Sequence, residues 1–566
     1  MTSLCDQDAG WMCGTRARAL PTLTRSNYSE RMALPTIGAR AEDGPPRRHS
    51  VQETEPRRRV NDQSSNTSFD VAVVGGGPAG AVAGRLLAQW GHSVVILNRP
   101  GSQSSLLGES IPPSTRKILD RVGALKAMES AGFVRSTGHT VWWGESDGRV
   151  EEFPEGETGF QVRRTDLDRV LLALAEEAGA RLVPDATVRD VESDGDLNRV
   201  EYRLGSGAEG DSTHVVRAHW VLDCSGRSGV VARNFRRPEE GQATLALLGI
   251  WRSPNGWTIP DETHTLVESF ADGWAWSVPI DQEVRYFTTM VDPRVSEMER
   301  SKEVGSIYRA EMAKTLRMEG LLTGAVMEGE AWACNASMYS ASRYAEGRTL
   351  LVGDAATFLD PVSSFGVKKA LASAWRAAVV VHTALTKPEM EAAAVELHEG
   401  RERRTYASYR SQAAEVFRSA SEEHAFWERR GRKYEDSDAF DEDGEPDIEQ
   451  LRNDPKVLTA FDALRRSPSI DLVRGDELSV VHRPVIVDNE VVLEDRLASP
   501  RVPSGLRHLR GVDVQRLLQI SSDHVQVPDL FEAYCRLDKP VILPDFMGAL
   551  SVLLSHGILV NRAPRG

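Results

Sequence analysis

The sequence predicts an α/β protein with a Rossmann-like nucleotide-binding domain, interrupted by a mixed or antiparallel β-sheet and followed by a helical C-terminal region. Three observations support this fold class. Residues 69–97 read as an apolar strand, a glycine cluster, an Ala- and Leu-rich helix and a second apolar strand, which is the order of a βαβ unit. A later strand ends at Gly353 and precedes an Ala-rich helix at 367–385. Between the two, residues 245–339 are Trp-rich and alternate as antiparallel strands do.

Composition narrows the function classes. The chain has 566 residues and a formal net charge of −15, from 68 Lys and Arg against 83 Asp and Glu. At roughly 150 residues per domain it allows about three or four domains. Acidity argues against nucleic-acid binding and favours a weakly charged small molecule. The cysteines lack metal-site spacing, and no apolar run approaches the roughly 18 residues of a membrane span, so we expect a cytoplasmic protein without a metal site or membrane contact.

Changes in composition and hydrophobic pattern along the chain predict five segments. Residues 1–68 are rich in Arg, Ser, Thr and Pro without an apolar period, which predicts a disordered leader; a transit peptide is less favoured because acidic residues interrupt it. The nucleotide-binding domain is expected to be discontinuous, because the sheet region separates its two glycine-bearing strands. The boundaries that we expect are 1–68 for the leader, 69–244 and 340–387 for the nucleotide-binding domain, 245–339 for the sheet (a substrate domain), 388–480 for a charged helical region with an acidic loop at 435–445, and 481–566 for a small C-terminal module of unknown role.

The glycine cluster after the first strand carries the strongest local signal. Gly75, Gly77 and Gly80 form a G-x-G-x-x-G motif between a strand and a helix. Such glycines permit a tight turn, a close approach to a pyrophosphate and tight helix packing, while the helix N-terminus favours the anion. This predicts a dinucleotide site; the alternative is an ordinary tight turn. The acidic residue expected at the end of the second strand is replaced by Asn98 and Arg99, so a ribose would be held without a carboxylate.

Three later segments resemble flavoprotein hydroxylases and their relatives. They are 161–168 (QVRRTDLD), 221–226 (VLDCSG) and 351–356 (LVGDAA), in this order. The resemblance implies that the dinucleotide is FAD and that Asp354 meets its ribityl and pyrophosphate region; the alternative for Asp354 is a helix N-cap. The residues expected to bind FAD are Gly75, Gly77, Pro78, Ala79, Gly80, Asn98, Arg99, Arg164, Asp223, Gly226, Gly353, Asp354, Pro361 and Gly366.

Three further motifs resemble the flavin-dependent halogenases. Residues 273–279 (GWAWSVP) match the family signature G-W-x-W-x-(I/V)-P, residues 108–117 resemble the segment that ends in the catalytic lysine, and residues 358–366 resemble the flavin- and halide-facing loop. Together they cover about 69–385. The resemblance implies that reduced FAD, oxygen and halide form hypohalous acid, which then halogenates an aromatic ring. No second nucleotide motif is visible, so reduced FAD is expected from a separate flavin reductase.

The resemblance also assigns roles to single residues. Lys117 would hold the oxidant and is expected to be buried, because desolvation lowers the pKa of an ammonium; the alternative is a surface lysine. Trp274 and Trp276, two residues apart on a strand, would share one face and form a barrier between flavin and substrate, or else be ordinary core aromatics. The residues expected to bind halide through backbone N–H groups are Ser364, Phe365 and Gly366, although the serines could equally cap a helix.

One departure bears on the substrate. Tryptophan-type halogenases carry a glutamate in the halide loop, where this chain has Ser363. We therefore expect a phenolic or pyrrolic acceptor, free or carrier-tethered, rather than an indole. Two other hypotheses stay open: an FAD-dependent monooxygenase or hydroxylase on the same scaffold, and a flavin-binding regulatory or docking protein that uses its tail to hold a partner.

Overall fold

The computed structural model describes residues 68–99, 107–144, 147–205, 212–296, 298, 302–420, 423–433, 454–467, 469–537 and 540–562. The expected leader, apart from its last residue, and the acidic loop at 435–445 lie outside these ranges. Among the helices within them, none combines the length and hydrophobicity that a bilayer crossing requires.

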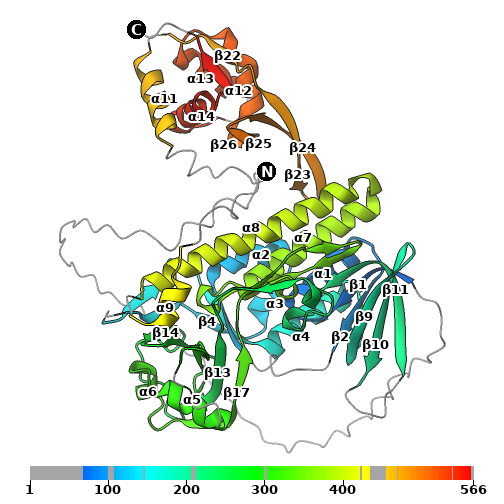
Figure 1. Cartoon of the computed structure of the whole chain (residues 1–566), viewed down its shortest axis with the longest axis vertical. Coiled ribbons are helices and arrows are strands. Elements are labelled where there is room, and N and C mark those ends of the chain that lie inside the picture. Colours follow the sequence, from blue (N-terminus) through cyan, green and yellow to red (C-terminus); the bar gives the residue numbers. More distant parts are fainter. Residues whose placement is uncertain are drawn as a thin grey trace, which may run out of the picture. The chain divides into compact units, whose positions relative to one another are not determined.

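The first domain is built on a largely parallel sheet, which confirms the predicted Rossmann-like core (Figure 1). β1 (Ser68–Val74) lies between β2 (Val94–Asn98) and β11 (Thr213–Asp223), and these three strands are parallel. β8 (Arg181–Pro184) continues the sheet beyond β2, and β20 (Thr349–Leu351) continues it beyond β11. The carboxyl ends of β1, β11 and β20 therefore meet at one edge, where such sheets bind ligands. The antiparallel strands β9 (Ala186–Asp194), β10 (Leu197–Leu204) and β19 (Ala345–Glu346) complete the sheet.

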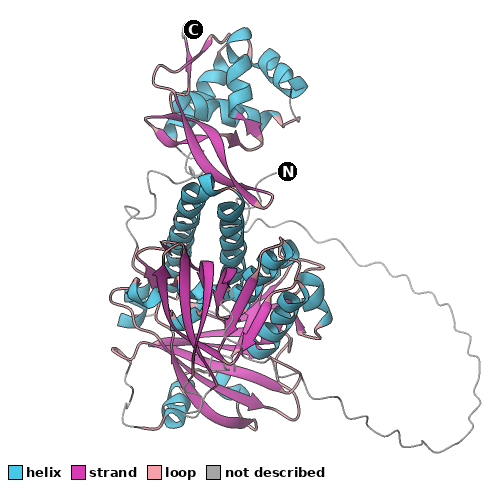
Figure 2. Cartoon of the chain, turned by 90° about the vertical axis from the view of Figure 1, so that its right-hand side faces the viewer, coloured by secondary structure: helices cyan, strands magenta, loops and turns pink. Residues whose placement is uncertain are grey.

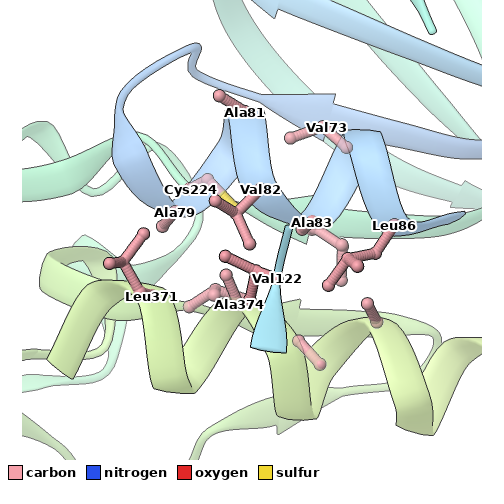
Figure 3. Close-up of a cluster of buried hydrophobic side chains, with 14 of the residues drawn as sticks. Val73, Ala79, Ala81, Val82, Ala83, Leu86, Val122, Cys224, Leu371 and Ala374 are labelled. Carbon is pink, nitrogen blue, oxygen red and sulfur yellow. The ribbon is translucent and has the colours of Figure 1, made fainter. Parts of the chain in front are cut away.

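Two helices pack closely on one face of this sheet (Figure 3). α1 (Pro78–Gln89) and α7 (Gly366–Thr386) meet through small side chains such as Ala79 and Ala374, and α4 (Arg164–Glu177) packs on α1. Small residues let helix axes approach closely. As a result the start of α1 lies beside the turn after β20, and a Cβ built on Gly353 would lie 3.1 Å from the Cβ of Ala79.

A second sheet has seven strands in the order β17-β13-β16-β15-β14-β5-β6. It is antiparallel except for the parallel β14–β5 pair. Of the two arrangements expected from the sequence, mixed or antiparallel, the sheet is therefore the mixed one. Its last two strands come from 138–152, which the sequence analysis assigned to the nucleotide-binding domain. α5 (Val304–Met312) and α6 (Arg317–Leu321) cover one face. The strands are β5 (Gly138–Trp142), β6 (Arg149–Glu152), β13 (Leu245–Arg252), β14 (Thr265–Phe270), β15 (Gly273–Pro279), β16 (Val284–Val291) and β17 (Val326–Asn335).

Two small three-stranded sheets hold segments that matter for the site. The first joins β3 (Gly108–Ile111), β7 (Gly159–Arg163) and β4 (Val134–Ser136). The second joins β12 (Arg236–Pro238), β18 (Tyr339–Ala341) and β21 (Thr357–Phe358). The short helices α2 (Arg116–Arg121) and α3 (Leu125–Ser130) follow β3.

The charged region after α7 is helical, as predicted. α8 (Glu391–Arg418) runs beside α7 in both views (Figures 1 and 2). The C-terminal end of α8 and the following α9 (Ala425–Arg430) pack on the face of the second sheet that α5 and α6 leave open, through residues such as Phe417 and Trp427. This region therefore closes the second sheet rather than standing apart.

The C-terminal module has its own hydrophobic core and contains strands as well as helices. Val457 and Leu464 of α11 (Pro455–Arg466) belong to this core, and β22 (Leu472–Arg474) pairs with the terminal β28 (Leu559–Asn561). The boundary expected at 480 thus falls inside the module. The amphipathic helix α11 was not recognised as part of the module, because its apolar residues are spaced among charged ones. The other elements are β23 (Ser479–Val487), β24 (Glu490–Ser499), β25 (Val502–Leu506), β26 (His508–Leu509), β27 (Val512–Asp513), α12 (Val514–Ile520), α13 (Val527–Leu537) and α14 (Leu543–Ser555).

Candidate functional site

The turn between β1 and α1 has the shape of a pyrophosphate cradle. Gly75 has φ +104°, and a Cβ there would lie 2.5 Å from the carbonyl oxygen of Cys224. A Cβ on Gly80 would lie 1.9 Å from the carbonyl oxygen of Gly75, so neither position accepts a side chain. α1 begins after Gly77 without a side-chain cap, which leaves its first N–H groups for an anion. The predicted cradle residues Gly75, Gly77, Pro78, Ala79 and Gly80 therefore fit the pyrophosphate of a dinucleotide.

Arg164 lies beside this cradle at the start of α4. Its side chain contacts Glu109 at 3.2 Å and Asp168 at 3.4 Å, and a Cβ on Gly77 would lie 3.7 Å from its Nη2. Although burial opposes the charge, Asp168, Glu109 and Asp354 hold the pKa of Arg164 above its ordinary value. A permanently charged guanidinium next to the cradle suits a phosphate ligand. Glu109 has a role that the sequence analysis did not assign, because only the fold brings β3 to α4.

The side chain of Asn98 forms a hydrogen bond with the glycine turn after β1. Its Oδ1 accepts a hydrogen bond of 3.1 Å from the backbone N–H of Gly76. The amide nitrogen of Asn98 is the part left to meet a ribose. Arg99 is exposed at the end of the strand. Ribose binding by these two residues stays a prediction.

Asp223 shapes the turn that follows β11. Its buried carboxylate accepts hydrogen bonds from the backbone N–H groups of Ser225 (3.1 Å), Val231 (2.8 Å) and Ala232 (2.9 Å). These local contacts use both oxygens, so the structural role of Asp223 is to hold the loop that carries Gly226. A direct contact of Asp223 with FAD stays a prediction.

Arg236, which the sequence analysis missed, joins two of the turns at the sheet edge. Its guanidinium donates to the carbonyl oxygens of Gly226 (2.7 Å) and Arg227 (2.6 Å) after β11. It also donates to the carbonyl oxygens of Asp354 (3.1 Å) and Ala355 (3.1 and 3.2 Å) after β20. A five-donor planar fork suits this clamp, which a Lys could not reproduce. The surrounding sequence has no motif that would have revealed it.

Asp354 follows β20 in a short 3-10 helix (Gly353–Ala355), where Gly353 has φ +63°. The Oδ1 of Asp354 lies 2.9 Å from the Nζ of Lys369 on α7. The Lys369 side chain is fully buried, whereas the Asp354 side chain is 29% exposed. Lys369 therefore holds one side of the carboxylate while the other side is open, as a flavin contact requires. A lysine within an Ala-rich helix was the available signal for Lys369.

The second sheet presents aromatic residues on the face toward α8 and α9. Trp274 and Trp276 lie on this face, whereas Ala275 packs in the cluster under α5 and α6. This confirms that the two tryptophans share one face. Across β16 and β13 the register leads from Trp274 to Cys334 and from Trp276 to Trp332, both on β17. Trp332 is thus a further residue of this face that sequence reasoning did not single out.

The predicted flavin- and halide-facing loop meets the same face. Phe358 and Val362 pack against the cluster that contains Trp274 and Trp276. Arg227, in the turn after β11, donates to the carbonyl oxygen of Asn335 at 2.9 Å and lies 5.5 Å from the ring centre of Phe358. The structure thus brings the loop, the Trp motif and a predicted FAD turn together. The aromatic residues Trp143, Trp274, Trp276, Trp332, Phe358, Phe417 and Trp427 belong to this cluster, together with Val362.

The loop itself is held by Asp360. Burial raises the pKa of its carboxyl to about 6, although Arg430 and the N–H of Val362 favour the charged form. Asp360 caps the 3-10 helix Pro361–Ser363, and the Ser363 hydroxyl donates to the carbonyl oxygen of Asp360 at 3.0 Å.

The start of α7 leaves backbone donors without a side-chain cap. Ser364 has φ +52°, and its N–H donates to the carbonyl oxygen of Pro361 at 2.9 Å. The N–H of Phe365 donates to Oγ of Ser363 at 3.5 Å. Two of the three predicted halide donors are therefore already engaged within the loop, while the positive dipole end of the 21-residue α7, which begins at Gly366, is available to an anion. Halide binding by Ser364, Phe365 and Gly366 stays a prediction.

Lys117 is exposed, contrary to the expected burial. α2 buries Leu119, and two residues correspond to about 200° around a helix, so Lys117 points to the opposite side. Its catalytic role rests on the resemblance alone. Among the described residues, no group of three or more His, Cys, Asp or Glu side chains could hold a metal ion.

Comparison with known proteins adds to this geometry. A family described as an FAD-binding domain matches residues 68–415. The tryptophan 2-halogenase of Chondromyces crocatus is 29% identical over 342 residues, which are 59% of this chain and 65% of that protein. The chain thus spans just under two thirds of the length of this relative.

Two solved structures share the fold. The flavin-dependent halogenase CmlS has a TM-score of 0.69 at 22% identity, covering 88% of this chain and 96% of its own. The peptidyl tryptophan dihydroxylase QhpG has a TM-score of 0.60 at 22% identity, covering 87% of this chain and all of its own. The same fold therefore occurs in a protein named as a halogenase and in one named as a hydroxylase.

Proposed function

Because the chain belongs to the FAD-binding-domain family of flavoproteins, we propose that it is a flavin-dependent halogenase. The observation that carries this proposal is the meeting of Trp274 and Trp276 with the loop 358–366 in one cluster beside the turns predicted to bind FAD. A halogenase needs this neighbourhood, since halide, oxidant and acceptor must come together away from water. An ordinary FAD protein needs the turns alone.

FAD, when bound and reduced, supplies the oxidation of a halide by oxygen to hypohalous acid. In this proposal the start of α1 and Arg164 bind the pyrophosphate, and Asp354 orients the ribityl region. The first N–H groups of α7 hold the halide. Trp274 and Trp276 separate the acceptor from the flavin, so that the acceptor meets only the halogenating species.

The proposed acceptor is a phenolic or pyrrolic ring, free or carrier-tethered. The support is Ser363, which stands where an indole halogenase carries a glutamate and whose hydroxyl is engaged within the loop. An electron-rich phenol reacts without an added carboxylate base. The proposed source of reduced FAD is a separate flavin reductase.

The alternative function is an FAD-dependent hydroxylase, which the fold shared with the peptidyl tryptophan dihydroxylase favours. Incubation with reduced FAD, oxygen, bromide and a reactive phenol separates the two. We expect a brominated phenol by mass spectrometry. A hydroxylated product without any brominated one would select the alternative.

Lys117→Ala tests the proposed role of Lys117, which rests on the resemblance alone. The resemblance predicts that this variant loses halogenation and keeps oxidation of reduced FAD. Retained halogenation removes Lys117 from the mechanism and leaves the remainder of the proposal intact.

A further inference from the structure

A cavity of about 710 Å³ lies where the hairpin β23–β24 meets α8. Its volume falls within the roughly 300–1,000 Å³ of small-molecule sites. Arg348 lines it directly before β20, whereas the turn predicted to bind FAD follows the other end of that strand at Gly353. Val395, Leu397 and Pro484 form an apolar part of its wall. None of the residues expected to bind FAD or halide, all of which the structure describes, lines this cavity.

The hairpin is anchored to the first domain at its far end. Val491 of β24 is fully buried in the core that α1 and α7 share, and its N–H donates to Oγ1 of Thr383 at 2.9 Å. Lys387 and Glu490 form an ion pair of 2.6 Å at the same junction. The attachment of the hairpin therefore does not depend on the cavity side chains alone.

Arginines are the most frequent side chains in the wall of the cavity. Six arginines and four glutamates line it, so the net charge of its side chains is positive, although that of the whole chain is −15. A positive cavity in an acidic protein concentrates anions there. The arginines are Arg348, Arg401, Arg403, Arg404, Arg483 and Arg496.

The glutamates offset little of this charge inside the cavity. Glu391 forms two hydrogen bonds with Arg348, at 2.9 and 3.1 Å. Oε1 of Glu399 accepts from two backbone N–H groups at 3.0 and 3.3 Å. Glu389 and Glu396 are exposed, whereas five of the six arginines are half-buried or buried. The positive groups therefore line the inside, and the remaining acids lie toward solvent.

Gly400 keeps space open beside one of these arginines. It lines the cavity within the 28-residue α8. Glycine is one of the residues least suited to a helix interior. A Cβ at Gly400 would lie 3.4 Å from Nη1 of Arg404, so a larger side chain would occupy the space next to the guanidinium. A residue that is unfavourable for the helix and leaves this space open indicates that the space is used.

We propose that this cavity binds a phosphorylated small molecule. Guanidinium groups bind phosphate oxygens through paired, charge-assisted hydrogen bonds. They come from two walls: Arg401 and Arg404 lie on α8, and Arg483 and Arg496 lie on the hairpin, where Arg496 also contacts Glu494 at 3.0 Å. A phosphate carries up to two charges, so arginines of both walls can share it, while the apolar part of the wall contacts the body of the molecule. The inference is independent of the proposed halogenase activity.

The probe is ADP, titrated by calorimetry into the full chain with and without bound FAD, after removal of excess FAD. We expect ADP to bind when FAD is bound, and adenosine, which lacks the phosphates, to bind about a hundredfold more weakly. Arg404→Gln and Arg483→Gln, one from each wall, should each weaken ADP binding about tenfold, through loss of a charge-assisted hydrogen bond. Arg418→Gln is the matched control, because Arg418 is exposed on α8 outside the cavity.

Filling the cavity separates ligand binding from folding. Gly400→Leu places a side chain beside Arg404 and replaces glycine with a good helix former. We expect ADP affinity to fall about tenfold or more, with a urea unfolding midpoint equal to or above that of the parent chain. If either arginine variant does not fold, Gly400→Leu decides the matter alone.

Three results would each overturn the inference. One is an ADP affinity that is unchanged in Arg404→Gln, Arg483→Gln and Gly400→Leu. Another is equal binding of ADP and adenosine. The third is ADP binding that disappears when FAD is bound, which would assign ADP to the glycine cradle. Failure of bromination would leave the phosphate site standing, and failure of ADP binding would leave the halogenase activity standing.

Discussion

The buried ion pair between Lys369 and Asp354 predicts an unequal response to loss of either partner. Asp354→Asn leaves the ammonium of Lys369, whose side chain is 0% exposed, without a counter-charge, because the oxygens of Thr357 and the new amide oxygen are all neutral acceptors. Removing one partner of a buried pair typically costs about 3–5 kcal/mol, because the remaining charge is unpaired. Lys369→Met leaves Asp354, which is 29% exposed and can be solvated, so we expect a smaller cost of about 1–2 kcal/mol.

The assay is urea unfolding of the full chain with each variant and with the double variant. In the double variant no unpaired charge remains, so its cost should fall about 2–3 kcal/mol below the sum of the single costs. Lys368→Met is the matched control on the same helix: Lys368 lies 5.3 Å from the ring centre of Phe365 and outside the pair, so we expect a change below about 1 kcal/mol. A cost for Lys369→Met equal to or above that for Asp354→Asn, or strict additivity in the double variant, would contradict an unpaired buried ammonium as the source of the cost.

Two further predictions concern the turns and the loop. Arg236→Lys removes most of the five hydrogen bonds that join the turns after β11 and β20, so FAD affinity measured by flavin fluorescence should fall about tenfold or more. The control is Arg237→Lys at the exposed neighbouring position, which should leave FAD affinity unchanged. Equal affinities in both variants would contradict the role of Arg236 in joining the turns. Asp360 has a folded-state pKa raised from 3.8 to about 6, so the folded state holds this proton more tightly than the unfolded chain does. The resulting stabilisation is fully present below pH 3.8, and the free energy of unfolding should fall by about 3 kcal/mol as the pH rises through 6. Asp360→Asn should remove this part of the pH dependence in urea unfolding, and parallel pH profiles for the two proteins would contradict the assignment.

The sequence predicted most of the fold because its signals are local. The glycines at 75–80, the apolar strands and the Ala-rich helix at 367–385 can each be predicted from a short stretch of sequence. The facing of Trp274 and Trp276 follows from strand geometry alone and was predicted correctly. The module boundary was misplaced because α11 is short and its apolar residues are spaced among charges.

The parts that the sequence did not reveal depend on contacts between distant segments. Arg236 meets residues ten and more than a hundred positions away, and no local pattern marks it. The pairing of Glu109 with Arg164 needs β3 and α4 to be adjacent. Lys117 was expected to be buried from a motif offset, but its place on α2 relative to Leu119 decides its exposure.

The ratio of halogenated to hydroxylated product, measured as bromide is raised from zero, decides whether the protein is a halogenase or a hydroxylase. The full chain is given reduced FAD, oxygen and a phenol, and both products are quantified by mass spectrometry. We expect no hydroxylated phenol at any bromide concentration and a brominated phenol that increases with bromide until saturation. Hydroxylated phenol formed at a rate independent of bromide, with no brominated product, would contradict it.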